Sequence, residues 1–131
     1  MTRRVAVIVG VLLLAWGDVP EAGTMRMVVA DLPYARVWDA ALRALSDYPM
    51  ERTADGVIET AWTERVPRDG EAGFQRILDR VRVRVERFAE RVTRVTVEVE
   101  AKGWRDGQWV PIADTRAREQ AILDRIREAE S

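Results

Sequence analysis

The chain has 131 residues, 47% of them hydrophobic, and its 21 basic and 22 acidic residues give a formal net charge of -1. That length allows one domain with a modest apolar core. Histidine and cysteine are both absent. Their absence excludes the common serine triad, cysteine nucleophiles, thiolate or imidazole zinc sites, and disulfide bonds.

Residues 1–17 have the pattern of a secretory signal peptide. Arg3 and Arg4 precede an apolar run of 12 residues, and Ala15 and Gly17 are the small residues that a cleavage site requires. A membrane-spanning helix needs about 20 apolar residues, so an uncleaved anchor is only the alternative. We therefore expect a periplasmic or otherwise exported protein. Without a cysteine at the cleavage point, it cannot carry a lipoprotein anchor.

The residues after the leader predict a linker and one folded domain. Residues 18–23 are expected to be the linker, and residues 24–131 a single α+β domain. Residues 24–30 alternate in a way that favours a β-strand.

An amphipathic helix follows this strand. It is expected to begin near Pro33 with Asp31 as a cap, and to end before Pro49. Its apolar residues recur with the 3.6-residue period of one helical face: Tyr34, Val37, Trp38, Ala41, Leu42, Leu45 and Tyr48.

The pair Asp55-Gly56 predicts a tight hairpin turn between strands at residues 50–54 and 57–66. The pairing places Arg52 opposite Glu59 and Thr53 opposite Ile58. Opposite charges then face one another, as a formed hairpin favours. The following segment, residues 67–73, is rich in Pro, Gly and charge and is expected to be a mobile loop.

Residues 74–88 fit a helix by spacing, yet Val81, Val83 and Val85 also alternate with charged residues as in a strand. A second alternating run supports the strand, because folding the chain near Glu90 aligns the two runs. We predict strands from about residue 79 and from residue 93. The expected pairs are Val81 with Val99, Val83 with Val97, Val85 with Val95, Arg80 with Glu100 and Arg82 with Glu98.

A second Asp-Gly turn, Asp106-Gly107, places Trp104 opposite Trp109. Asp114 is expected to cap a final helix. The apolar stripe of that helix is Ile122, Leu123, Ile126 and Ala129. The predicted fold is therefore α+β, an antiparallel sheet with the long helix and the C-terminal helix packed on one face and the other face in solvent.

The candidate interaction surface consists of Trp104, Trp109, Arg105 and Arg68. The two tryptophans form either an exposed patch that binds a partner or only a cross-strand pair that stabilises the hairpin. Trp38 and Trp62 are instead expected in the core, because each follows the apolar register of its element.

Other chemistries are weakly supported. An arginine series along the sheet suggests nucleic acid, but a solvated face neutralised by glutamates explains it better, so no nucleic acid is expected. Carboxylate pairs, Asp106 with Asp114 or Asp55 with Glu59, are the remaining catalytic option, although such pairs arise by chance in a chain with 22 acidic residues. No catalytic residue, cofactor or metal is expected.

Several motifs together resemble the helix-grip domain of BamC-like (NlpB/DapX) envelope lipoproteins. They are Val37-Trp38-Asp39-Ala40-Ala41-Leu42, Asp55-Gly56-Val57-Ile58-Glu59-Thr60-Ala61-Trp62, Val81-Arg82-Val83 and Thr93-Arg94-Val95-Thr96-Val97. The resemblance covers about residues 25–130. It implies a small non-enzymatic accessory domain of the bacterial envelope that contacts other proteins, as in outer-membrane β-barrel assembly. The chain lacks the lipid-bearing cysteine of that family, and no functional residues carry over.

We therefore expect an exported protein-interaction module of the envelope, acting through the sheet rim at Trp104 and Trp109 or through residues 67–73. Its partners would be envelope proteins of unknown identity. Association with the outer membrane is part of this expectation, either indirectly or through an uncleaved N-terminus. One alternative is a ligand- or lipid-binding module with a groove between the long helix and the sheet. Another is a carboxylate-dependent hydrolase.

Overall fold

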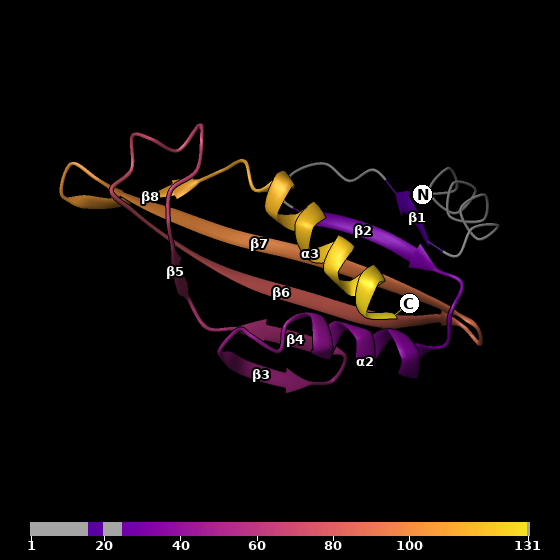
Figure 1. Ribbon diagram of the computed structural model, residues 1–131. Coiled ribbons are helices and arrows are strands. Elements are labelled where there is room, and N and C mark those ends of the chain that lie inside the picture. Colours follow the sequence, from indigo (N-terminus) through magenta and orange to yellow (C-terminus); the bar gives the residue numbers. More distant parts are fainter. Residues whose placement is uncertain (1–15, 20–24, 131) are drawn as a thin grey trace.

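A computed structural model describes residues 16–19 and 25–130, which form one antiparallel sheet with two helices (Figure 1). The order of hydrogen-bonded strands is β1-β2-β7-β6-β4-β3, with β5 also paired to β6 and β8 to β7. The predicted α+β class is confirmed. The elements are β1 (Trp16–Val19), β2 (Met25–Ala30), α2 (Tyr34–Ala44), β3 (Met50–Ala54), β4 (Val57–Thr60), β5 (Thr63–Arg65), β6 (Arg76–Ala89), β7 (Val92–Arg105), β8 (Gln108–Ile112) and α3 (Arg116–Glu130).

The long β6–β7 hairpin forms the middle of the sheet. Its register is the predicted one: Val81 pairs with Val99, Val83 with Val97, Val85 with Val95, Arg80 with Glu100 and Arg82 with Glu98. Because strand side chains alternate, this register sends the valines to one face and the charged residues to the other. On the charged face, Arg80 Nη2 lies 2.7 Å from Glu100 Oε1, and Arg94 Nη2 lies 3.1 Å from Glu86 Oε1.

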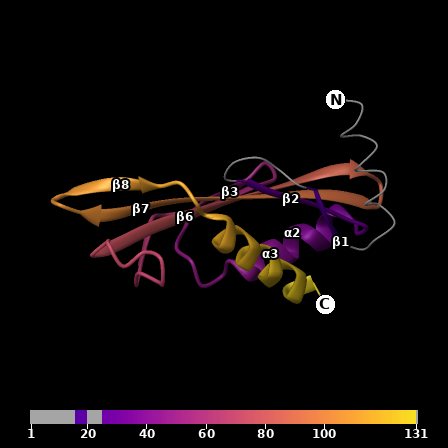
Figure 2. The same cartoon turned by 90° about the horizontal axis from the view of Figure 1, so that it is seen from above.

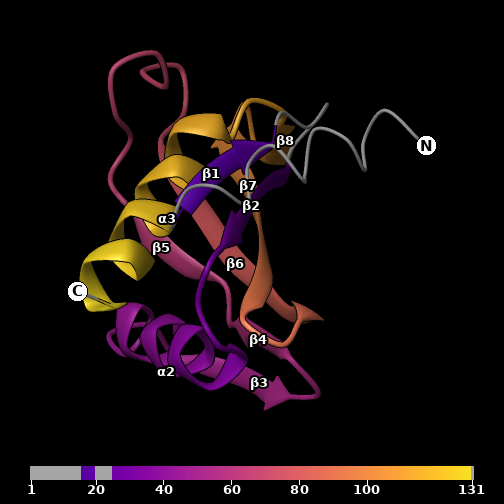
Figure 3. The same ribbon diagram turned by 90° about the vertical axis from the view of Figure 1, so that its right-hand side faces the viewer.

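Both helices pack on the valine face, as predicted (Figures 2 and 3). Small residues on the buried side of α2 let this helix lie close to the sheet, and a stripe of α3 completes the core. Each valine, leucine or isoleucine side chain of this core contributes about 1.5–3 kcal/mol when it is fully buried, and an alanine contributes less. The buried set includes Val37, Ala40, Ala41, Ala44 and Leu45 from the first helical segment, Ile122, Leu123 and Ile126 from α3, and Val81, Val83, Val95 and Val97 from the sheet.

Polar contacts join α3 to α2 and to the turn that follows α2. Arg125 Nη2 lies 2.7 Å from Asp47 Oδ1, and Arg43 Nη2 donates to the Ala129 carbonyl at 2.7 Å. Arg36 also pairs with Glu130.

The ends of the helices differ from the prediction in three respects. α2 ends at Ala44, before Tyr48, and the chain then forms a turn in which the Tyr48 N–H donates to the Leu45 carbonyl. Asp31 does not cap α2, because Pro33 occupies the N-cap position and no side chain bonds there. At α3, Thr115 occupies the N-cap position, because its carbonyl accepts the Glu119 N–H. The predicted cap, Asp114, lies one residue earlier, where its Oδ1 accepts from the Arg116 N–H at 3.4 Å.

An unpredicted strand, β1, pairs antiparallel with β2. It covers the end of the expected leader and the first two residues of the expected linker, so Asp18 and Val19 belong to the sheet. Residues 1–15 and 20–24 lie outside the described residues, and cleavage of the leader stays a prediction. In the part of the chain that the structure describes, neither helix combines the length and the apolar character needed to span a bilayer.

The predicted strand at residues 57–66 is divided into β4 and β5. Thr63 lies five positions after Ile58, but its partner Asp79 lies only four positions before Val83, so one extra residue bulges out between the two pairings. At the interruption, the Thr60 Oγ1 accepts the Val81 N–H at 2.9 Å. A shift by one residue reverses the faces of a strand.

The bulge between β4 and β5 changes the position of Trp62, which was predicted to lie in the core. Its ring instead lies on the charged face of the sheet, next to Arg80 and Lys102. The prediction for Trp62 was wrong because it continued the alternation of β4 through the bulge. Trp38 does pack against the core, half-buried and stacked on Tyr34 with the ring centroids 6.2 Å apart.

A buried carboxyl group fills a second gap in the backbone ladder. Pairing of β7 with β2 stops at Glu98 and pairing with β8 starts at Ala101. Between them, Glu119 Oε2 from α3 accepts the Val99 N–H at 3.2 Å and the Thr115 hydroxyl at 3.0 Å. Glu119 is fully buried, and this burial raises the pKa of its carboxyl above 4.5.

We predict that Gly56→Ala destabilises the fold far more than Gly107→Ala. Both glycines have a φ of +75°, so each substitution incurs about 1–2 kcal/mol of left-handed strain. Only at Gly56 would the added Cβ also lie 2.7 Å from a backbone oxygen, that of Val85. This overlap adds about 1–3 kcal/mol. Urea unfolding measures both variants, and equal losses would contradict the packing at β6.

We predict that Glu119→Gln stabilises the protein at neutral pH. A carboxyl whose pKa is raised on folding weakens the native state as it ionises, so the wild type loses stability as pH rises from 4.5 through the higher native value. Glutamine cannot ionise but retains the acceptor for Val99. The variant should therefore match the wild type near about pH 4 and exceed it near about pH 7. A pH-independent difference in the free energy of unfolding would contradict a buried, titrating Glu119.

Candidate interaction surfaces

Three tryptophans gather on the helix-free face of the sheet, at the end distant from β2. We call Trp62, Trp104 and Trp109, with Leu78 and Lys102 between them, the tryptophan patch. The strand register brings them together, since Trp104 pairs with Trp109, and Lys102 lies between its partners Leu78 and Pro111. The rings of Trp104 and Trp109 meet edge to face at 5.3 Å, which confirms the predicted cross-strand pair.

Cationic side chains lie against these rings. Lys102 Nζ lies 4.3 Å from the Trp62 ring centroid and 5.6 Å from that of Trp109. The guanidinium of Arg80 lies 4.8 Å from the Trp62 centroid. Such contacts contribute about 0.5–1 kcal/mol at exposed sites. A pocket of about 340 Å³ opens beside Trp62, Lys102, Trp109 and Pro111.

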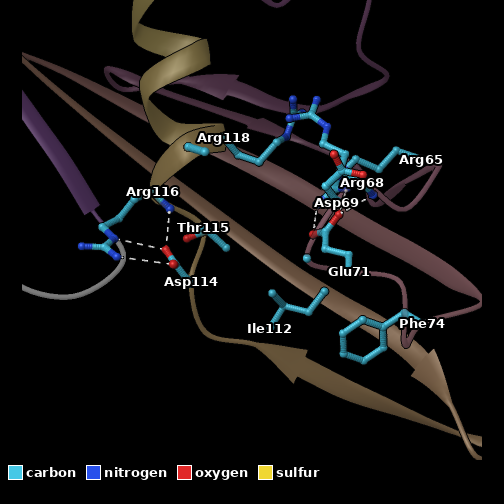
Figure 4. Close-up of a pocket in the computed structure, with 12 residues that line it drawn as sticks. Arg65, Arg68, Asp69, Glu71, Phe74, Ile112, Asp114, Thr115, Arg116 and Arg118 are labelled. Carbon is cyan, nitrogen blue, oxygen red and sulfur yellow. Dashed lines mark hydrogen bonds and ion pairs between the residues drawn. The ribbon is translucent and has the colours of Figure 1, made fainter.

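The helix-bearing side of the same end holds a larger cleft of about 510 Å³ (Figure 4). The loop between β5 and β6 forms one wall and the start of α3 the other, with Ile112 of β8 and Phe74 as apolar members. The remaining lining side chains are mainly charged: Arg65, Arg68, Asp69, Glu71, Asp114, Arg116 and Arg118.

Arg65 links the loop to the sheet beneath this cleft. Its two Nη atoms donate to the two carboxylate oxygens of Glu71 at 2.8 and 2.9 Å, and its Nε donates to Asp79 Oδ2 at 2.7 Å. Asp79, whose side chain is only 2% exposed, also accepts from Arg118 Nε at 3.2 Å. A buried carboxylate needs such compensation. The loop that composition predicted to be mobile is therefore tied to the sheet through Glu71.

The contact with Arg65 also lowers the pKa of the Glu71 carboxyl group. The guanidinium of Arg65 holds the pKa of Glu71 at about 2, and the Arg68 backbone N–H adds a 2.9 Å hydrogen bond to the same carboxylate. Ionised Glu71 is thus part of the folded state.

The four residues predicted as one surface lie on two. Trp104 and Trp109 belong to the tryptophan patch, whereas Arg68 lines the cleft. Arg105 is on the cleft side as well, with its guanidinium 4.9 Å from the ring of Phe74. Trp62 and Lys102 were missed: Trp62 reaches the patch only through the bulge, and the signal that could have indicated Lys102 is that it is the single lysine of the chain.

The groove expected between the long helix and the sheet is not among the two described cavities, because α2 fills that space with buried side chains.

The candidate catalytic carboxylates are residues of tight turns or members of ion pairs. Asp55 and Asp106 have φ values of 56° and 54° in their turns. Ion pairs with Arg82 and Arg116 lower the pKa of Glu59 and of Asp114, the opposite of what a general acid needs.

The charged face of the sheet carries arginines and glutamates from neighbouring strands. Several arginines of the charged face pair with glutamates of neighbouring strands, as the solvated-face interpretation expects. Within residues 25–130, no three acidic side chains cluster closely enough to bind a metal ion. No protein-family model matches the chain, and no curated protein matches it.

We predict that Glu71→Gln destabilises the fold by about 1–2 kcal/mol at neutral pH, because Arg65 loses a charged bidentate partner. A carboxyl whose pKa is lowered on folding stabilises the native state above its ordinary value of 4.5 and loses that effect as pH falls to about 2. The difference from wild type should therefore disappear across that interval.

Glu64→Gln is the matched control for this measurement. Glu64 also pairs with an arginine, Arg76, but both side chains are about half exposed, at 51% and 52%. Solvent screens such a pair, so this variant should change the free energy of unfolding much less. An equal loss in the two variants would show that the Arg65 network is no stronger than a surface ion pair.

Proposed function

We propose that this chain is an exported accessory protein of the bacterial envelope that acts as a non-catalytic protein-interaction module. The tryptophan patch is its docking surface. The observation that carries the proposal is the location of Trp62, Trp104 and Trp109 on the face of the sheet that no helix covers, each of them half-buried. Tryptophan is enriched among the residues that dominate binding energy at protein interfaces.

The fold does not require the patch for its own core. The buried cluster is built from the valine face of the sheet and the apolar sides of the two helices, and none of the three tryptophans belongs to it. Three large rings kept half-exposed at one end of a sheet are the kind of surface that marks an interaction site.

Export and kinship are parts of the same proposal. The basic, apolar and small-residue pattern of residues 1–17 supports export. An antiparallel sheet with its helices on one face supports a helix-grip relationship to BamC-like envelope proteins, and so an association with outer-membrane assembly. The absence of histidine and cysteine, with candidate carboxylates engaged in turns and ion pairs, supports a non-catalytic role.

A second candidate function is small-ligand or lipid binding, which the cleft beneath the β5–β6 loop favours by its size. Ligand pockets commonly measure about 300–1,000 Å³, and the cleft measures about 510 Å³. Its lining is largely charged and internally paired, whereas ligand pockets are mostly apolar. We therefore rank it second.

In cells that export the full chain, we predict that a photo-crosslinking benzoylphenylalanine at Trp104 captures a discrete envelope protein. The same group at Arg84 should not, because Arg84 is exposed on the same face of the sheet but lies in β6 well away from Arg76, the strand partner of Trp104. Adding Trp109→Ser should remove the crosslinked product, while Arg68→Ser should leave it unchanged. Equal capture from Trp104 and Arg84, or loss with Arg68→Ser alone, would contradict docking at the patch.

A further inference from the structure

Lys102 is the single lysine among the 21 basic residues of the chain, and it occupies the centre of the tryptophan patch. Its Nζ contacts two indole rings, that of Trp62 from the segment between β4 and β5 and that of Trp109 from β8. A lysine ammonium is a compact point charge with three donors, unlike the planar fork of arginine. The position therefore holds one concentrated positive charge with donors available.

The charge of Lys102 is not neutralised by its neighbours. Arg76 pairs with Glu64 at 2.8 Å, and Arg80 pairs with Glu100 at 2.7 Å. In contrast, Lys102 forms no ion pair with any of the described residues, and its contacts are with the two rings. The patch therefore has one uncompensated cation at its centre.

The surroundings of Lys102 suit a carboxylate joined to an apolar group. The pocket of about 340 Å³ is large enough for one side chain, and Lys102 is half-buried beside it. Glu100 also lines the pocket, but its carboxylate is paired with Arg80 at 2.7 Å. Exclusion of water strengthens a charge-assisted hydrogen bond. The faces and edges of Trp104 and Trp109 offer apolar contact for a neighbouring residue of the same ligand.

We propose that Lys102 binds the side-chain carboxylate of an acidic segment in the protein partner, while the flanking tryptophans contact an adjacent apolar residue of that segment. This inference rests on the proposed function and names the chemistry of the partner. Charge complementarity selects the acidic residue, and the rings select the apolar one.

Two synthetic peptides test the proposal on the full chain: acetyl-Gly-Glu-Leu-Glu-Phe-Gly-amide and its isosteric neutral counterpart with glutamine in place of both glutamates. Tryptophan fluorescence follows the titrations. The acidic peptide should bind at least about tenfold more tightly than the neutral one, and added salt should reduce the difference. Equal affinities, or no binding of either peptide at millimolar concentration, would overturn the proposal.

Variants at Lys102 separate its charge from its packing. Lys102→Met keeps an aliphatic stem between the rings and should lose about tenfold in affinity for the acidic peptide, whereas Lys102→Arg should keep most of it. Acetylation of the single lysine should reproduce the methionine variant. Circular dichroism checks that each variant is folded. Unchanged affinity in Lys102→Met would overturn the role of the charge.

The crosslinking experiment distinguishes failure of this inference from failure of the proposed function. If Trp104 still captures its partner in Lys102→Met with undiminished yield, docking at the patch stands and the carboxylate contact is wrong. If the acidic peptide binds through Lys102 but no protein is captured at Trp104, the site binds acidic peptides and the envelope function is wrong.

Discussion

The register of the β6–β7 hairpin is the constraint on which the rest of this structure depends. Strand side chains alternate between faces, so a register that pairs Val83 with Val97 fixes the side of every neighbouring residue. The valines form a surface that must be covered, and two helices cover it. The arginines and glutamates form the opposite surface, where ion pairs across strands satisfy them. A slip by one residue would place charges beneath α2 and valines in solvent.

The sheet continues past two interruptions because side chains replace missing backbone partners. Thr60 accepts the Val81 N–H where β4 gives way to β5, and Glu119 accepts the Val99 N–H where β2 gives way to β8. Both positions are buried, where an unpaired N–H would be costly. The bulge at the first interruption also turns Trp62 to the outer face. A local irregularity in the ladder therefore completes the tryptophan patch.

The features that were predictable from the sequence are those set by local spacing. Alternating valines fixed the β6–β7 pairing, and the Asp-Gly pairs fixed both tight turns, where Asp55 and Asp106 have positive φ. The periodic spacing of apolar residues predicted both helices, α2 and α3. The tethering of the β5–β6 loop was not predictable, because Arg65 and Asp79 meet only after the strands have paired.

The candidate site was predicted only in part. Trp104 and Trp109 meet across a two-residue turn, so their contact follows from the sequence alone. The bulge that brings in Trp62 has no Gly or Pro to indicate it, and alternation continued through it gives the wrong face. Arg68 and Arg105 belong to the cleft side. Arg105 directly follows Trp104 in β7, so the alternation of strand side chains alone would have placed it on the opposite face. The position of Arg68 depends on the direction of the loop and could not be predicted from composition.

The placement of the patch and of the helices follows from the pairing of β6 with β7, which nuclear Overhauser contacts between α-protons test most directly. The Val81 and Val99 amides bond outward, to Thr60 and Glu119, so the two residues form a pair whose α-protons face each other. We predict strong α-proton contacts between Val81 and Val99, between Val83 and Val97, and between Val85 and Val95. Contacts displaced by one residue, such as Val83 with Glu98, would contradict the register and with it the assignment of the two faces.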